Sequence, residues 1–295
     1  MRELAAVLLA MLASSLYAAA SALQALEARR APASTALRAS LLGRLARRKL
    51  WLAGTGSSVV GWGLQAAALA LASVTLVQPA LGLGLIVLLV LGVKLLHERV
   101  GVREIGGAVA IAAAVAALAW AGPSEATSFT RAGSWAVGIA IVLTALAPFG
   151  LRLVRLAGGL ATSIVSGIGW ACVGLGTALA VSALSDRRWL VAIGWGLGVG
   201  LASGSTLLAE MTALQSWPAT RSIPVVFGLE MALPAAVAPL LSTGASPPHP
   251  VAFGLALVVA CAGAALLGSS RSVASQMAAG AEPGGSQHEP TAATV

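Results

Sequence analysis

The chain has 295 residues, of which 58% are hydrophobic and only 9% are charged, and its formal net charge is +8. Soluble domains carry roughly 25% charged residues, so this composition excludes a water-soluble globule. It predicts an all-α polytopic membrane protein, because several apolar stretches reach the roughly 20 residues that a helix needs to cross a bilayer. The basic residues lie in short connections and form no groove-like patch with aromatic residues, so we expect no nucleic-acid partner.

Hydropathy and helix breakers predict nine transmembrane helices. A cleaved signal peptide is the alternative for the first of them, but Glu3 weakens its basic start and a polar stripe follows one face of the helix, so we interpret it as a span. The tail, 269–295, is rich in Ala, Gly, Ser and Pro and is expected to be a disordered cytoplasmic tail. In chain order the nine spans cover about 4–26, 50–73, 77–96, 104–121, 133–150, 158–184, 189–213, 221–242 and 250–268.

The distribution of Lys and Arg predicts the orientation in the membrane. The connection between the first two spans is heavily basic, and a cytoplasmic location for it places Lys94, Arg103 and Arg155 on the same side. The predicted topology therefore has the N-terminus outside and the C-terminus inside, in the plasma membrane. Arg187 and Arg188 fall on the outer side and are the exception to the rule.

Two halves of the chain resemble each other. Segments 46–79 and 185–218 each contain basic residues, then Trp-Leu, a Gly-rich helix, an Ala/Leu stretch and a closing Pro. Spans 1–4 then correspond to spans 6–9, which gives an inverted 4+1+4 repeat: a first repeat (1–121), a connector helix (122–157) and a second repeat (158–268). Inverted repeats are common in secondary transporters, which bind their solute near the membrane midplane at the repeat interface.

One carboxylate, Glu230, interrupts the apolar run IPVVFGLEMALPAAVAPLL (223–241). It lies about 15 Å into the eighth span at 1.5 Å per residue, near the membrane midplane. Acids at this depth are costly and mark ion or proton pathways, so Glu230 is the first candidate for substrate binding or proton coupling. The structural alternative is a protonated Glu230 that hydrogen-bonds to a neighbouring helix.

Polar stripes on the first two spans supply further candidates. Tyr17 and Gln65 would donate or accept hydrogen bonds along a substrate path, and Trp62 would form a flat apolar wall. Packing between helices is the alternative, since Ser and Gly are ordinary interface residues in membranes. The stripes are Ser14, Tyr17, Ser21 and Gln24 in the first span, and Ser57, Gly61 and Gln65 in the second.

The seventh span ends in a short hairpin. Glu210 lies near its end and Arg221 begins the next span, so we expect a structural ion pair or a cytoplasmic gate between them. Gly196, Gly200 and Gly204 recur every fourth residue in the same span. This stripe predicts close packing against a neighbouring helix.

No sequence motif indicates catalysis. Cys172 and Cys261 lie inside apolar segments without metal-ligand spacing, so we expect no disulfide and no metal site. No reactive constellation stands at either predicted membrane face. We therefore expect no enzyme activity and no cofactor.

The segment LLHERVGVREIGGAVAIAAAVAALAW (95–120) resembles the EamA-type signature of the drug/metabolite transporter (DMT) superfamily: Leu-x-Glu-Arg, a short turn and a Gly-rich helix. The resemblance covers most of residues 4–268, and the nine spans look most like the NIPA-like branch. That branch is associated with magnesium transport and carries Gly-Glu followed by Asn where this chain has Trp62 and Gln65. The resemblance also implies a helix-end role for Glu98.

The sequence favours a DMT-type secondary transporter that moves a small organic solute by alternating access, with proton coupling through Glu230 as a further hypothesis. One alternative is a NIPA-like carrier of magnesium or another divalent cation, which needs a cluster of oxygen ligands. The other is a non-transporting membrane scaffold or assembly protein, in which Glu230 would face a packed helix. The expected partners are the lipid bilayer and a small solute or ion, and the question of a homodimer stays open.

Overall fold

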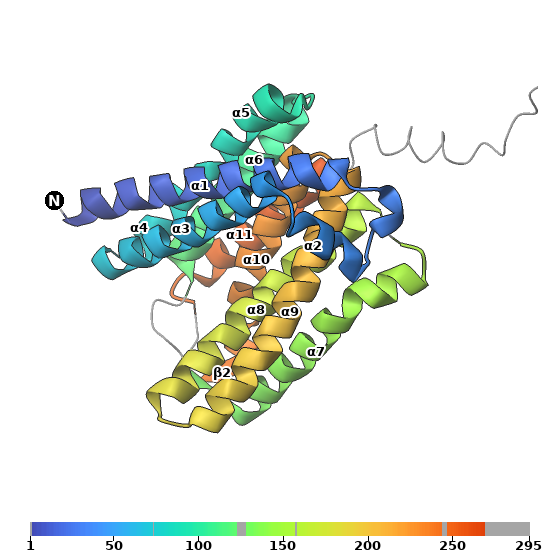
Figure 1. The fold of residues 1–295 in the computed structure, drawn as a ribbon. Coiled ribbons are helices and arrows are strands. Elements are labelled where there is room, and N and C mark those ends of the chain that lie inside the picture. Colours follow the sequence, from blue (N-terminus) through green and yellow to red (C-terminus); the bar gives the residue numbers. More distant parts are fainter. Residues whose placement is uncertain (1, 73, 123–127, 157, 244–246, 269–295) are drawn as a thin grey trace, which may run out of the picture.

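The computed structural model describes residues 2–72, 74–122, 128–156, 158–243 and 247–268 (Figure 1), and the predicted tail, 269–295, lies outside these residues. The elements are α1 (Arg2–Arg30), the 3-10 turn η1 (Ala33–Thr35), α2 (Ala39–Leu45), α3 (Lys49–Leu71), α4 (Val74–Gly82), α5 (Gly84–Leu96), α6 (Val102–Ala121), β1 (Ser128–Phe129), α7 (Arg131–Leu153), α8 (Gly159–Ser185), α9 (Trp189–Ser216), α10 (Ala219–Leu241), β2 (Ser242–Thr243) and α11 (Pro250–Gly268). The two strands form a single antiparallel pair, so the described chain is all-α apart from this contact.

Eight segments among the described residues are long and apolar enough to cross a membrane, which confirms a polytopic helical membrane protein. They are α1, α6, α7, α8, α9, α11, the stretch Pro79–Leu96 and the stretch Ala219–Val237 of α10. The second predicted span is present as α3, which has 23 residues but includes Thr55, two serines and Gln65. Because α3 is less apolar than the others, the count of nine spans stays a prediction.

The third predicted span consists of two helices rather than one. It breaks at Leu83, between the end of α4 at Gly82 and the start of α5 at Gly84. A glycine pair weakens a helix, because glycine loses the most backbone freedom on folding. Gly84 also brings α5 very close to α1: a Cβ atom there would lie 2.8 Å from the carbonyl oxygen of Ser14.

The helices on the two sides of α7 have similar neighbours. In the first group, α1 packs along α3 and against α4 and α5, and in the second group α8 packs along α9 and against α10. The groups meet where α6 packs on α11, and a Cβ at Gly263 would lie 3.1 Å from the Gly107 carbonyl oxygen. Figure 1 shows α1 and α3 side by side, while α7, α8 and α9 run obliquely away from them.

The glycine stripe of α9 was expected to pack closely, and this prediction is wrong. Open space surrounds the Cβ positions of Gly196, Gly200 and Gly204. The close contact between α8 and α9 uses a glycine of α8 instead: a Cβ at Gly169 would collide with the Thr206 side chain. A stripe of small residues permits a close approach but does not say which face of the helix meets a partner.

A hydrophobic cluster joins the two groups at one end of the bundle, which we call the closed end. It connects the end of α1, α2 and the start of α3 with the end of α9 and the start of α10. Trp51 Nε1 donates a hydrogen bond to Met211 Sδ at 3.3 Å, and Leu37 N donates to Thr212 Oγ1 at 3.0 Å. The buried members are Ala25, Ala28, Leu41, Leu45, Trp51, Leu208, Met211, Leu214 and Ala219.

Candidate functional site

A cavity of about 720 Å³ lies between the two helix groups. Its walls come from α1, α3, α4 and α5 on one side and from α8, α9 and α10 on the other. Small-molecule sites usually have volumes of about 300–1,000 Å³ and apolar walls with a few placed polar groups, and this cavity fits that description. Trp62 and Val59 line the cavity near the middle of α3 and also reach the surface of the bundle, where their side chains are 68% and 64% exposed.

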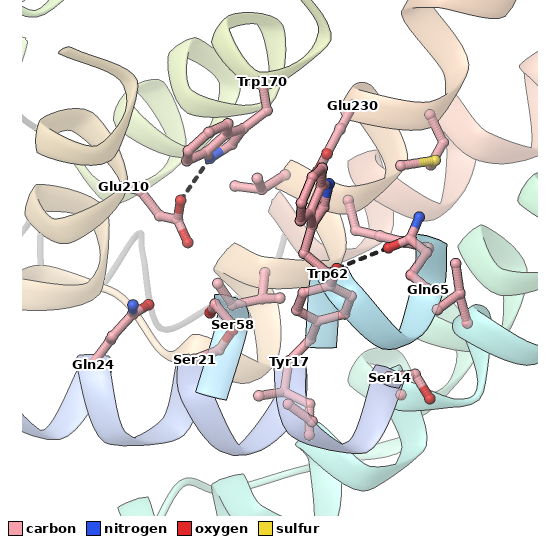
Figure 2. Close-up of a pocket in the computed structure, with 18 of the residues that line it drawn as sticks. Ser14, Tyr17, Ser21, Gln24, Ser58, Trp62, Gln65, Trp170, Glu210 and Glu230 are labelled. Carbon is pink, nitrogen blue, oxygen red and sulfur yellow. Dashed lines mark hydrogen bonds between the residues drawn. The ribbon is translucent and has the colours of Figure 1, made fainter. Parts of the chain in front are cut away.

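The structure places Tyr17, Trp62, Gln65 and Glu230 around this one cavity (Figure 2). The Tyr17 hydroxyl donates a hydrogen bond of 2.8 Å to Gln65 Oε1 and so links α1 to α3 across the cavity wall. This bond holds both side chains at the cavity wall. Residues predicted from three different spans therefore converge on one space.

The polar stripe of α1 lies along the cavity as a whole, since Ser14, Tyr17, Ser21 and Gln24 all line it. The stripe of α3 is rotated from the predicted one. Ser58 lines the cavity, whereas Gly61 packs on α1, where its Cβ position lies 3.2 Å from the Tyr17 ring. Successive residues of a helix point about 100° apart, so a predicted stripe that contains Ser57 lies on a different face of α3 from one that contains Ser58.

Glu230 projects from α10 into the cavity (Figure 2). Its side chain is half-buried, and no described residue forms a hydrogen bond or ion pair with its carboxylate. Tyr17 and Glu210 lie within electrostatic range of it. The alternative of a Glu230 hydrogen-bonded inside a packed helix interface does not describe this arrangement.

The structure gives Glu210 and Arg221 different partners, which corrects the ion pair predicted between them. Arg221 pairs with Glu104 of α6, with 2.7 Å between Nη2 and Oε1 and a hydrogen bond of 2.9 Å from Nε. Glu210 lines the cavity and accepts a hydrogen bond of 2.7 Å from Trp170 Nε1. The reason is depth: Glu210 lies six residues, or about 9 Å, before the last residue of α9, whereas Arg221 lies in the first turn of α10.

The cavity has an electrostatic character of one sign. Among the described residues that line it, the charged side chains are Glu210 and Glu230. Aromatic side chains stand near them, notably Trp62, Trp170 and Phe227. Carboxylates and aromatic ring faces both attract cations.

Trp170 was not among the predicted site residues. It lies on α8, and its indole both lines the cavity and holds Glu210. The signal that could have found it is the predicted repeat, in which the span of α8 is the counterpart of the span of α1. The polar stripe of α1, carried over to α8, reaches Trp170 at the position of Ser21.

Glu98 follows α5 and acts on a different helix. Its carboxylate accepts hydrogen bonds from the backbone N–H groups of Ala219, at 2.7 Å, and Thr220, at 2.9 Å, which open α10. It also accepts a hydrogen bond from the Thr220 hydroxyl and forms an ion pair with Arg29 at the end of α1. A carboxylate satisfies the free N–H groups and the positive dipole of a helix start, so Glu98 fastens α1 and α10 together at the closed end.

These observations define a polytopic, all-helical membrane protein with a central cavity that contains two carboxylates. Comparison of the chain with protein-family models, with curated protein sequences and with solved structures finds no significant match. The resemblance to the DMT superfamily therefore rests on the sequence motifs alone.

Proposed function

We propose that the protein is a secondary transporter of the DMT type that moves a small organic solute across the membrane by alternating access. The observation that carries the proposal is the cavity between the two helix groups, which contains an acid without a compensating partner among the described residues. A membrane protein gains no stability from such an acid, and acids inside spans mark ion and solute pathways.

The neighbours of the helices support an inverted repeat. The helices α1, α3 and α6 have counterparts in α8, α9 and α11, and α4 with α5 corresponds to α10. One contact does not follow this correspondence. The repeat makes the contact of α1 with α9 equivalent to a contact of α8 with α3, but α1 packs on α9 while α3 and α8 line opposite sides of the cavity. In alternating access, the second state would bring α8 onto α3 and separate α1 from α9.

The predicted topology assigns a side to this state. The closed end holds the heavily basic connection between α1 and α3, which the charge rule places in the cytoplasm. In this topology the closed end lies on the cytoplasmic side of the cavity, with the N-terminus outside and the C-terminus inside.

The charge of the cavity narrows the solute class. Two carboxylates and four aromatic side chains favour a small solute with a positively charged group, such as an amine or a guanidinium, over an anion. A proton and a cationic solute would compete for Glu230. That competition would couple the uptake of one to the release of the other.

Two alternatives receive less support. The two acids in one cavity are the observation in favour of a divalent-cation carrier. Hard cations, however, need several oxygen ligands. No group of three or more His, Cys, Asp or Glu among the described residues could hold a metal ion. A scaffold or assembly protein would contain a packed Glu230 and no central cavity.

The proposal is tested by reconstitution of the protein in liposomes. Uptake of a panel of amines, guanidinium compounds, neutral solutes, anions and Mg²⁺ is measured under an imposed proton gradient. The variants are Glu230→Gln and Glu210→Gln, and the matched control is Glu3→Gln, which neutralises an exposed acid at the start of α1. We expect proton-driven uptake of cationic solutes, a loss of about tenfold or more in Glu230→Gln, and no change in the control.

Each arm of this experiment decides a separate point. If no solute or ion moves faster than in protein-free liposomes, the transport proposal fails. Uptake of Mg²⁺ without any organic solute would instead select the divalent-cation carrier. Proton-driven uptake that survives in Glu230→Gln would remove the coupling role of that residue and leave the transport function standing.

A further inference from the structure

A second, smaller cavity lies at the closed end, outside the central cavity. Its volume is about 200 Å³, and it lies between the end of α1 and the turn that joins α2 to α3. Arginines form half of its lining. The lining residues are Glu27, Arg30, Ala31, Pro32, Arg44, Leu45, Arg47 and Arg48.

The charges of this cavity are not balanced. Glu27 is the one acid in the lining, and it pairs with Arg30 at 2.7 Å and more loosely with Arg48 at 3.9 Å. The guanidinium groups of Arg44 and Arg47 have no hydrogen-bond or ion-pair partner in the part of the chain that the structure describes. Four positive charges therefore face one negative charge, and an added anion would relieve their mutual repulsion.

The backbone that carries these arginines is held in place. Leu41 and Leu45 of α2 are fully buried in the core of the closed end, which anchors the short helix that carries Arg44. Arg48 is the N-cap residue of α3, where no side chain caps the helix and no acidic residue lies in the first turn. The free N–H groups and the positive dipole of this helix start add to the attraction for an anion.

We propose that this cavity binds a phosphate group, either in the head of an anionic phospholipid or in a small soluble phosphate. Guanidinium groups bind phosphate oxygens with paired hydrogen bonds, and several arginines around one cavity are suited to that geometry. A candidate membrane span, α1, ends at Arg30, so the cavity lies at the level where lipid head groups occur. This site is separate from the central cavity and does not depend on a transport function.

The test uses the full-length protein in detergent. Native mass spectrometry measures retained phosphatidylglycerol, with phosphatidylcholine as the zwitterionic control, and the melting temperature is measured with and without inorganic phosphate. The test variant is Arg44→Gln with Arg47→Gln. The matched control is Arg187→Gln with Arg188→Gln, which removes the same charge from the exposed connection between α8 and α9.

We expect the test variant to retain about tenfold less phosphatidylglycerol than the wild type, while the control retains as much as the wild type. A variant with both arginines changed to lysine keeps the charge and loses the paired hydrogen bonds, and should lie between the two. If retention is unchanged but stabilisation by phosphate disappears only in the test variant, the site takes a soluble phosphate. Equal losses in test and control variants, or no loss in either assay, would overturn the proposal.

Discussion

The closed end and the central cavity differ in how their carboxylates are paired. At the closed end, Glu27, Glu98 and Glu104 each form an ion pair with an arginine. In the cavity, Glu230 has no cationic partner among the described residues, and Glu210 accepts its hydrogen bond from an indole. A buried acid that has an arginine partner has its desolvation cost offset by that partner, whereas an acid without one costs the fold free energy while it is present. The same residue type therefore stabilises the fold in one region and is available to a ligand in the other.

The largest effect is expected at Glu98, and Glu98→Ala tests the closed end most directly. The change leaves Arg29 without its partner and two N–H groups at the start of α10 without an acceptor. We expect a loss of about 4 kcal/mol in the free energy of unfolding, because the two N–H groups and the Thr220 hydroxyl are buried donors that lose their acceptor. Chemical denaturation in detergent measures it, with Glu3→Ala as the exposed control. Equal stability of the two variants would show that the closed end does not depend on its paired acids.

The next largest effect is expected at the pair of Arg221 and Glu104, which are 11% and 6% exposed. Arg221→Gln leaves the Glu104 carboxylate buried without its charged partner, and we expect a loss of about 3 kcal/mol. The double variant Arg221→Gln with Glu104→Gln should lose about 2 kcal/mol less than the sum of the losses of the two single variants, because it leaves no buried charge without a partner. Strictly additive losses in this cycle would mean that the pair contributes no coupling.

The positions of the helices could be predicted from the sequence because long apolar runs bounded by Pro, Gly and charged residues mark where a chain enters and leaves a membrane. The last predicted span, 250–268, coincides with α11, and the prediction 221–242 lies within two residues of α10. The interruption at Leu83 was missed, because hydropathy is continuous from Pro79 to Leu96.

Partners across the fold were harder to predict than helices. The cavity face of α1 follows from its own periodicity, since Tyr17 and Ser21 lie one helical turn apart. The partner of Arg221 does not, because Glu104 is 117 residues away and no local spacing connects the two. Glu210 is the acid nearer to Arg221 in sequence, but it lies deeper along α9, where it lines the cavity and pairs with Trp170.

A smaller effect is expected at the hydrogen bond between Tyr17 and Gln65, which belongs to the cavity wall. Tyr17→Phe removes the donor and keeps the ring, and Gln65 retains access to the open cavity. We expect a loss of about 1 kcal/mol in the free energy of unfolding, as is usual for one partly buried hydrogen bond. Gln65→Leu should cost a similar amount, and the double variant should lose little more than either single one. A loss as large as that of Glu98→Ala would show that this bond stabilises the fold as strongly as the paired acids of the closed end, which contradicts the comparison.

The smallest effect on stability is expected at Glu230, the acid that the comparison describes as unpaired. Glu230→Gln keeps the shape of the side chain and removes a charge that has no described partner to lose. We expect the free energy of unfolding to change by no more than about 0.5 kcal/mol, or to rise, because the desolvation cost of the charge disappears. The same measurement as for Glu98→Ala decides this, on protein from the same preparation as the transport assay. A stable variant that has lost uptake assigns the acid to the solute path, whereas a loss of several kcal/mol would make Glu230 a structural group like those of the closed end.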